Sequence, residues 1–537
     1  MSTEAVARDG VAAPDTGWTS VVNELTAELA LPSAGRTSAS PYETARLVSL
    51  APWLPRHAER IRYLLAGQRP DGGWGGPDGY ALVPTLSAVE GLLTAVRRDE
   101  PVNWSPAAVH DTVDRALRLL FDPTAGPATK PVPDLPAVDL IVPALVARIA
   151  EQLADPPPGL GRWRGVGGPP MPVGMDQQRL ERVRLLARSG RPMPPKLLHA
   201  LEILGPAARR TAGVTTTAGG TIGASPAATV AWLGGPAADQ PDALDYLSRV
   251  LAEYGSAVPC ATPITVFERS WVLSTLARAG ALPAVTPELL AELRDALGPE
   301  GAATGPGLPL DADTTAVTLY ALGALGHPTD PACLTRYDTG EHFCTWPGEN
   351  GASVTTNAHV LEALGRCLGP DDPYAASVSR RLTGWLLDRQ QADGSWSDRW
   401  HASPYYATYC VVLALREYGG PLASPALHRA VTWVLGSQRA DGSWGRWRGT
   451  AEETAYALLV LLAGPSSPAV DVARAAATQR LTTLDAEGVD DPLWHDKDLY
   501  HPALIVRAAV AAAQVSAVER LSGSAQGAPS RWSAPLE

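Results

Sequence analysis

Two aspartates, Asp311 and Asp313, stand two residues apart in the stretch GLPLDADTTAVTLYALGALGH, which begins at residue 307. When two carboxyl groups are close together in an apolar site, the pKa of one of them rises, because a second negative charge beside the first is unfavourable. Such a pair can keep a proton and donate it to a substrate as a general acid. Aspartate and threonine are also common helix caps, and alone the stretch favours that plainer role.

The elements that must position this pair are helices. Apolar residues recur at intervals of three and four in IRYLLAG, AVEGLLTAV, ATVAWLGG, WVLSTLARAG, TLYALGALG and AYALLVLLAG. Alternating patterns typical of strands are missing, and turns rich in Pro and Gly separate the short helices. Many helices are apolar on nearly every face, which predicts inner helices of a layered all-α structure. The length of 537 residues predicts two domains.

Composition excludes several classes of protein. The net charge of −12 argues against a nucleic-acid partner. The five cysteines form no CxxC pair and no metal-ligand spacing, which indicates reduced thiols in a cytoplasm. The polar first residues do not resemble a signal peptide, and the apolar run ALIVRAAVAAAQV is interrupted by Arg507 and too short to span a bilayer. We therefore expect a cytoplasmic protein without stable membrane insertion.

A short motif, Q-x-x-D-G-x-W, occurs three times. In each copy a tryptophan follows a glutamine after six residues, and an Asp-Gly pair supplies a tight turn between them. We predict a structural role, in which glutamine bridges backbone groups and tryptophan packs the helix ends together. The three pairs are Gln68 and Trp74, Gln390 and Trp396, and Gln438 and Trp444.

These repeats, together with DADTT, resemble the class II terpene cyclases, which build a carbocycle by protonating an alkene. Further segments resemble that family in the same order, and two of them, SDRWHASPYYAT and WHDKDLY, resemble segments of its bacterial diterpene branch. The resemblance implies a double α-α barrel, with a γ domain (50–275) inserted into a β domain (1–49 plus 276–537) and the substrate cavity between them. The similar segments are SPYETA, LVPTLSAVEGL, LLHALE, SPAATVAW, VPCATPITVFERSW, SDRWHASPYYAT and WHDKDLY.

The resemblance also assigns roles around the acid pair. Asp313 matches the proton donor, and Asp311 matches the acid that helps hold its neutral form. Thr314 stands where the DxDD pattern of the diterpene cyclases has a third acid. In ASVTTNAHVLEAL, His359 falls at the position of the donor's hydrogen-bond partner, with Asn357 as the alternative.

Aromatic faces stabilise a carbocation through their quadrupoles. The chain has 16 tryptophans and 14 tyrosines, and we select four of them as lining candidates: Trp271, Trp346, Tyr405 and Tyr406.

A histidine and an asparagine hold the water that removes the last proton in family members that make ent-copalyl diphosphate. His199 of LLHALE matches that histidine, whereas Cys260 of VPCATP stands in place of the asparagine. The resemblance thus predicts a less well-fixed water at this position, because a thiol is a weak hydrogen-bond partner.

The diphosphate end of the substrate has few candidates. Lys130, Arg399 and Lys497 could contact phosphate oxygens. The family commonly carries an acidic cluster that implies Mg²⁺, but of that cluster only Asp134 remains here.

The implied reaction is cyclisation of geranylgeranyl diphosphate to a bicyclic labdane-type diphosphate. The diphosphate should be retained, because the candidate DDxxD stretches, DDPYA and DDPLW, both lack the final acid. A class I terpene synthase would be a partner downstream, and the oligomeric state stays open. Alternatives are conversion of farnesyl diphosphate to drimenyl diphosphate, a squalene-type triterpene cyclase, a non-catalytic α-α barrel that binds a protein, and a prenyltransferase subunit.

Overall fold

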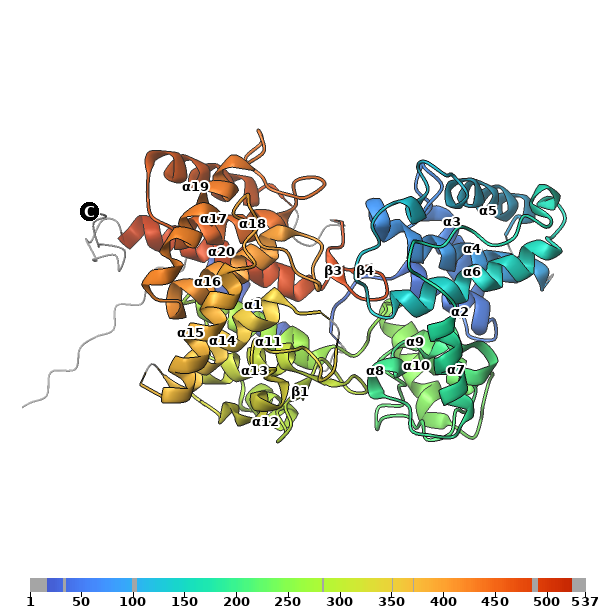
Figure 1. Cartoon of the computed structure of the whole chain (residues 1–537), viewed down its shortest axis with the longest axis horizontal. Coiled ribbons are helices and arrows are strands. Elements are labelled where there is room, and N and C mark those ends of the chain that lie inside the picture. The colour runs from blue at the N-terminus through green and yellow to red at the C-terminus, as the bar shows by residue number, and fades with distance from the viewer. Residues whose placement is uncertain are drawn as a thin grey trace, which may run out of the picture.

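The chain folds into two helical bodies that lie side by side, each around its own apolar core (Figure 1). The computed structural model describes residues 17–31, 35–98, 104–282, 284–349, 351–369, 371–484 and 491–523. The regular secondary structure of these parts is helical apart from two short hairpins. The predicted all-α double-barrel fold is confirmed.

The β domain is built on six inner helices in a closed ring, in which each helix packs against the next and the last returns to the first. These helices form the inside of the barrel because they are apolar on nearly every face. In α18, for example, every residue of AEETAYALLVLLA is buried. In order around the ring they are α11 (Thr265–Arg278), α13 (Ala312–Ala324), α14 (Val354–Leu368), α16 (Pro404–Tyr418), α18 (Ala451–Ala463) and α20 (Ala503–Gly523).

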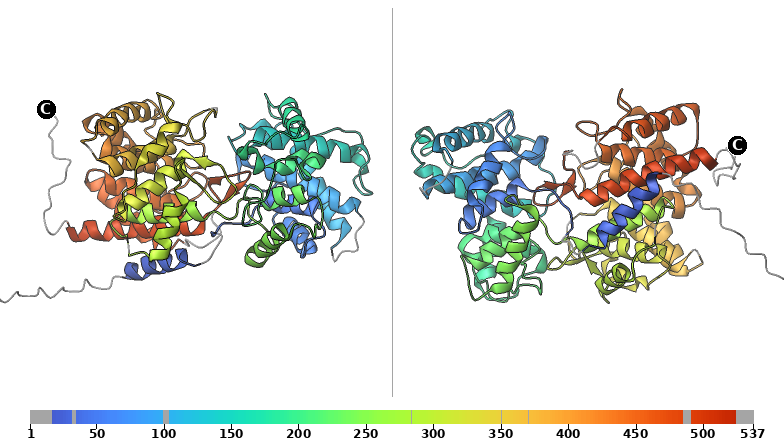
Figure 2. Two further views of the ribbon diagram at one scale, coloured as in Figure 1. Left: turned by 90° about the horizontal axis from the view of Figure 1, so that it is seen from below. Right: turned by 180° about the vertical axis from the view of Figure 1, so that it is seen from behind.

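Outer helices cover this ring and bury only one face each. Figure 2 shows α1 lying along α20 on the side hidden in Figure 1. The outer elements are α1 (Gly17–Leu29), α12 (Pro287–Ala296), η5 (Pro331–Tyr337), α15 (Pro373–Leu387), η6 (Pro421–Ala423), α17 (Ser424–Gly436) and α19 (Pro468–Leu481).

The γ domain also consists of a ring of inner elements covered by outer ones, and its ring is smaller. Its inner elements are α2 (Pro41–Leu50), α4 (Leu82–Arg97), α6 (Val138–Ala154), η4 (Leu201–Ala208) and α9 (Pro226–Leu233). Around them lie α3 (His57–Ala66), η1 (Asp78–Ala81), α5 (Pro106–Leu120), η2 (Pro127–Thr129), η3 (Gly161–Trp163), α7 (Gln178–Arg188), α8 (Pro195–Leu198) and α10 (Pro241–Tyr254).

One helix, over residues 78–97, is long and apolar enough to cross a membrane. However, 89% of its apolar window is buried inside the protein. Its apolar character is therefore accounted for by its place in the γ core.

The predicted domain boundaries are wrong by about one helix at each end of the inserted domain. Helix α2, assigned to β, buries Tyr42 and Leu47 in the γ core. Helix α11, assigned mostly to γ, buries Trp271 and Leu273 in the β core. Local periodicity predicts that a helix is buried but does not predict which of two cores it joins.

Two short β-hairpins position residues that the sequence analysis selected as candidates for the active site. The first pairs β1 (Ala302–Ala303) with β2 (Leu310–Asp311) and leads directly into α13. The second pairs β3 (Trp494–His495) with β4 (Leu499–Tyr500) and lies between the two bodies (Figure 1). Leu499 of this hairpin packs into the γ core, so the end of the β domain also fastens the γ domain.

The three Q-x-x-D-G-x-W copies have the predicted structural role. Each tryptophan is fully buried, and its indole N–H donates to a carbonyl ten residues earlier, as Trp396 does to Leu386 (2.8 Å). The preceding glutamine donates to two carbonyls, as Gln390 does to Gly394 and Ala426 (both 2.8 Å). The motif thus ties a turn to two neighbouring helices.

Candidate active site

The acid pair lies at the start of α13. Asp311 is the N-cap of this helix, and its carboxylate accepts hydrogen bonds from the backbone N–H (2.6 Å) and the hydroxyl (2.9 Å) of Thr314. Asp313 follows in the first helical turn. Helix capping and a close acid pair are therefore both present, and Thr314, in place of a third acid, holds Asp311.

His359 on the neighbouring helix α14 meets Asp313. Its Nδ1 lies 2.7 Å from Oδ1 of Asp313, and both side chains are largely buried. The ring of Trp271 stands edge-on to the imidazole at a centroid distance of 5.5 Å. The structure thus brings together the predicted donor, its predicted partner and one predicted aromatic side chain.

The protonation of this site follows from burial and charge. Burial raises the pKa of Asp311 to about 7, and the charge of Asp313 adds to this effect, while the hydrogen bond from Thr314 opposes it. Burial alone would lower the pKa of His359, but the adjacent Asp313 carboxylate raises it to about 10. Asp311 therefore exchanges its proton near neutral pH, and His359 keeps its own.

Asn357, the alternative partner, lies elsewhere. Its Oδ1 accepts from the backbone N–H of Phe343 (2.8 Å), and its Nδ2 donates to the carbonyls of Phe343 (3.0 Å) and Ser353 (2.8 Å). All its hydrogen bonds thus hold the loop before α14. Asp398, which the sequence analysis missed, caps α14 by accepting from the backbone N–H of Val354 (2.6 Å) and the hydroxyl of Ser353 (2.9 Å).

Aromatic side chains continue from Trp271. Its indole N–H donates to the hydroxyl of Tyr406 (2.8 Å), and Tyr406 in turn contacts the rings of Trp494 (4.7 Å) and Tyr456 (5.2 Å). Trp494 and Tyr456 were missed, although Trp494 belongs to the quoted WHDKDLY segment. These four rings form a continuous aromatic group beside His359.

Two further aromatic candidates lie apart from that group. Tyr405 points to the outer layer and packs against Trp433 of α17 at 4.6 Å. This orientation follows from α-helical geometry, which turns adjacent residues about 100° apart. Trp346 stands edge-on to Trp400 at 5.2 Å, close to Arg399.

Lys497 contradicts its predicted role as a phosphate contact. Its side chain is 0% exposed, and its ammonium group pairs with Glu43 (2.7 Å) and Glu202 (3.2 Å) of the γ domain. It also donates to the hydroxyl of Ser225 (2.9 Å) and the carbonyl of His199 (3.0 Å). The physical reason is that the β3–β4 hairpin inserts Lys497 between Glu202 and Glu43, which are far away in the sequence.

His199 and Cys260 lie at the edges of the same network. The two nitrogens of His199 contact the Gly223 carbonyl (2.6 Å) and Oδ1 of Asp496 (2.7 Å). Cys260 donates to Ser40 (3.1 Å), and burial raises the pKa of its thiol. Asp496 was missed because only the hairpin brings it to His199.

Arg399 joins the two domains near the proposed diphosphate end. Its guanidinium group pairs with Glu349 of the β domain (3.0 Å) and with Asp134 of the γ domain (2.8 Å). Lys130 is exposed at the surface beyond η2.

The residues do not fit a magnesium site held by the protein. Mg²⁺ takes oxygen ligands in octahedral geometry, but Asp134 is a single carboxylate, 62% exposed and paired with Arg399. Across the described ranges no three His, Cys, Asp or Glu residues gather as a metal would require.

Comparison with known proteins agrees with this site. Residues 350–501 match the family model of the squalene-hopene cyclase C-terminal domain. The chain is 42% identical over 499 residues to an ent-copalyl diphosphate synthase of Streptomyces sp. (strain KO-3988), covering 91% of this chain and 94% of the relative. It is 41% identical over 500 residues to a labda-7,13-dienyl diphosphate synthase of Streptomyces clavuligerus, covering 89% of each.

A solved structure extends the likeness to three dimensions. The ent-copalyl diphosphate synthase from Streptomyces platensis superposes with a TM-score of 0.88 at 42% identity, covering 94% of this chain and 100% of that one. The predicted resemblance is confirmed. The chain belongs to the class II terpene cyclase family and is a class II diterpene cyclase.

Proposed function

We propose that this cyclase converts geranylgeranyl diphosphate to a bicyclic labdane-type diphosphate and leaves the diphosphate attached. The observation that carries the proposal is the 2.7 Å contact between His359 and Asp313 beside a group of aromatic rings. The relatives named above make copalyl and labdadienyl diphosphates, which supports the twenty-carbon substrate and the labdane skeleton.

The acid works through its two neighbours. Protonated Asp313 transfers its proton to the terminal alkene, and the carboxylate that remains is stabilised by the imidazolium Nδ1–H of His359. Asp311, neutral below its raised pKa of about 7, keeps a second negative charge away from Asp313. The two carboxyl groups thus divide the roles of donor and tuner.

The substrate completes the reaction with its own electrons. The protonated alkene becomes a cation, two further double bonds close two rings in turn, and loss of a proton restores an alkene. The substrate and product are therefore isomers. The faces of Trp271, Tyr406 and Trp494 supply negative electrostatic potential beside the acid without a nucleophile that would trap the cation.

For the diphosphate we infer a place beside Arg399. Near this arginine the indole N–H groups of Trp346 and Trp400 are buried without a hydrogen-bond partner in the described structure. A phosphate oxygen would satisfy such donors. Arg399→Ala should raise KM about tenfold with kcat little changed, which steady-state kinetics would measure; an unchanged KM would place the diphosphate elsewhere.

The substrate and product are tested together. Purified enzyme would be incubated separately with geranylgeranyl and farnesyl diphosphates, and the products analysed by mass spectrometry before and after phosphatase treatment. We expect turnover of the twenty-carbon substrate to a bicyclic diphosphate without release of pyrophosphate. Preferred turnover of farnesyl diphosphate would instead indicate a drimenyl diphosphate synthase, and pyrophosphate released in step with the substrate would contradict retention.

The proposed reaction also bears on the cellular compartment and the partners of the enzyme. We propose that it acts in the cytoplasm on a small-molecule substrate, without nucleic acid or membrane insertion. A class I terpene synthase would then ionise the diphosphate that this enzyme leaves in place.

A further inference from the structure

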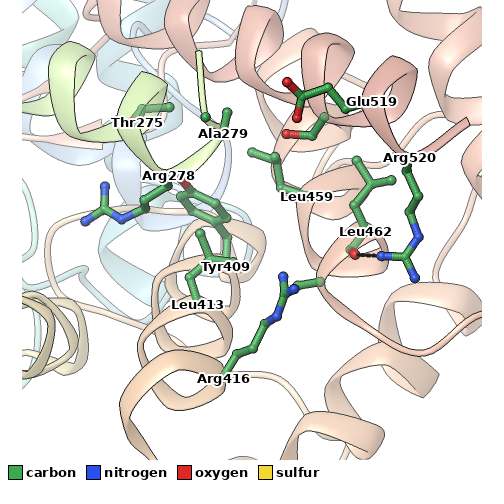
Figure 3. Close-up of a pocket in the computed structure, with 13 residues that line it drawn as sticks. Thr275, Arg278, Ala279, Tyr409, Leu413, Arg416, Leu459, Leu462, Glu519 and Arg520 are labelled. Atoms are coloured by element: carbon green, nitrogen blue, oxygen red, sulfur yellow. Dashed lines mark hydrogen bonds between the residues drawn. The ribbon is translucent and has the colours of Figure 1, made fainter. Parts of the chain in front are cut away.

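A cavity of about 410 Å³ lies where four inner helices of the β domain end (Figure 3). We call it the basal cavity. It is lined mostly by residues at or near the C-terminal ends of α11, α16, α18 and α20, together with Tyr409 from the second turn of α16. The lining residues are Thr275, Arg278, Ala279 and Gly280, then Tyr409, Leu413 and Arg416, then Leu459, Leu462 and Ala463, and last Ser516, Glu519 and Arg520.

The basal cavity is at the opposite end of the barrel from the acid. Asp313, His359, Tyr406 and Tyr456 all lie in the first two turns of their inner helices, so these helices run parallel. A helix of 15 residues spans about 22 Å. Arg416 lies ten residues after Tyr406 on α16, about 15 Å along the helix axis, whereas Tyr409, in the second turn, extends the basal cavity toward the reaction site.

A layer of tyrosines divides the two. Tyr409 lines the basal cavity and stacks on Tyr456 at 5.1 Å. Tyr456 contacts Tyr406, which belongs to the aromatic group beside His359. The basal cavity is thus a compartment of its own rather than an extension of the reaction site.

Its charged side chains differ in how they are matched. Arg278 is matched, because Glu362 holds it by two hydrogen bonds of 2.8 and 2.6 Å and Tyr320 stacks beneath it. Arg416 and Arg520 have no carboxylate partner in the described parts of the chain. Among the described residues, Arg520 donates to the carbonyls of Leu462 (2.6 Å) and Gly464 and to the hydroxyl of Ser466 (both 3.3 Å).

The two unmatched arginines are close enough to repel each other. Arg416 is exposed at the surface, and the burial of part of its side chain and the charge of Arg520 both lower its pKa. In Figure 3 their side chains reach from opposite sides toward the Leu462 end of the basal cavity, whereas the carboxylate of Glu519 lies on the other side, toward α11. Two cations facing one opening in a chain of net charge −12 favour an anion between them.

The rest of the wall combines apolar residues with the polar side chains of Thr275, Tyr409, Ser516 and Glu519. Leu413, Leu459 and Leu462 line the basal cavity next to these arginines. A ligand that fits therefore has an anionic head and an apolar chain, and the volume lies in the range of ordinary small-molecule sites.

We propose that the basal cavity binds a phosphate-terminated apolar chain, with the phosphate between Arg416 and Arg520 and the chain along Leu413, Leu459 and Leu462. Two sources share this chemistry: a free prenyl diphosphate and the headgroup end of a phospholipid. The site is separate from the acid, so it does not depend on the proposed cyclisation.

Decyl phosphate is a suitable probe, because it has the head and chain but no alkene to react. Calorimetric titration of the full chain would count the molecules bound and measure their affinity. We expect Arg416→Glu to remove one bound molecule or weaken it at least tenfold. Leu459→Trp, which fills the basal cavity without a charge change, should do the same. Arg380→Glu is the matched control, since Arg380 is exposed on α15 outside the basal cavity.

Further arms distinguish the sources. Decanol should bind at least tenfold more weakly than decyl phosphate. Geranylgeranyl diphosphate added to the Asp313→Asn variant should compete for the site if the source is free prenyl diphosphate. Flotation with phosphatidylglycerol vesicles, abolished by Arg416→Glu, would indicate the lipid. Turnover should stay unchanged in both cavity variants. The same stoichiometry and affinity for decyl phosphate in wild type and both cavity variants would overturn the proposal.

Discussion

Buried charged groups have different roles in the two domains: they stabilise the fold in one and supply the proton donor in the other. In the γ core, the buried acids contact cations, an arrangement that we call matched: Arg46 pairs with Glu90 at 2.6 Å, and Lys497 enters from the hairpin to pair with both Glu43 and Glu202. At the start of α13 in the β domain, Asp311 and Asp313 are close together, and only Asp313 contacts a cationic side chain, His359. A matched network stabilises a fold, whereas a surplus of buried carboxyl groups holds a proton that can be given away.

The largest expected effect concerns the acid pair at the start of α13 in the β domain. Asp313→Asn keeps the shape of the side chain and removes only the transferable proton. We expect kcat to fall at least about a thousandfold, while thermal unfolding and substrate binding stay close to wild type. Turnover within about tenfold of wild type would show that another group donates the proton.

Substitutions in the matched network of the γ domain should lower the free energy of unfolding rather than the rate of the reaction. Lys497→Met leaves Glu43 and Glu202 buried without their cation, and breaking a buried pair in this way costs about 3–5 kcal/mol. Urea unfolding would measure the loss. Adding Glu43→Gln and Glu202→Gln to the same variant should restore much of it. An unchanged urea midpoint in Lys497→Met would mean that the network contributes little to the fold.

A third effect concerns pH. Because the pKa of Asp311 is raised to about 7, its neutral form is favoured in the folded state. Its contribution to stability is therefore present below its ordinary pKa near 4 and is lost as pH rises through 7. His359, with a pKa of about 10, stays charged over this range. We expect kcat/KM to fall up to tenfold per pH unit above 7.

Asp311→Asn is the control for that profile. The amide cannot ionise, so the fall above pH 7 should disappear, at the cost of an overall activity about tenfold lower. If the variant shows the same fall as wild type, a different group titrates.

The acid site could be predicted from the sequence because its parts are local. Asp311 and Thr314 are three residues apart at a helix start, and their spacing alone specifies the capping hydrogen bonds. The glutamine and tryptophan of each repeat were equally predictable, because each contacts backbone within about ten residues as well as a neighbouring helix. The partner, His359, came from family resemblance rather than from spacing.

The positions of other candidate residues could not be predicted, because they depend on contacts between segments that are distant in the sequence or on the orientation of a side chain around its helix. The sequence predicts Lys497 as a phosphate contact, and only the hairpin that carries it into the γ core makes it a buried structural residue. Trp494 joins the aromatic group for the same reason. Tyr405 and Tyr406 are both predicted to line the cavity, but one residue of helical rotation places them on different faces of α16.

The smallest expected effect lies where the two kinds of site meet. His199 belongs to the matched network through Asp496, yet the family resemblance predicts that it helps hold the water that removes the final proton. Cys260 is buried and bonded to Ser40, and a thiol fixes a water less firmly than a carboxamide. We expect Cys260→Asn to leave turnover within about threefold of wild type, because the proton donor is untouched. It should shift the ratio of double-bond isomers and hydroxylated by-products, measured by gas chromatography with mass spectrometry after phosphatase treatment. His199→Ala should shift the same ratio in the opposite direction. Identical product profiles in both variants would place the last deprotonation outside this pair and leave His199 with a purely structural role.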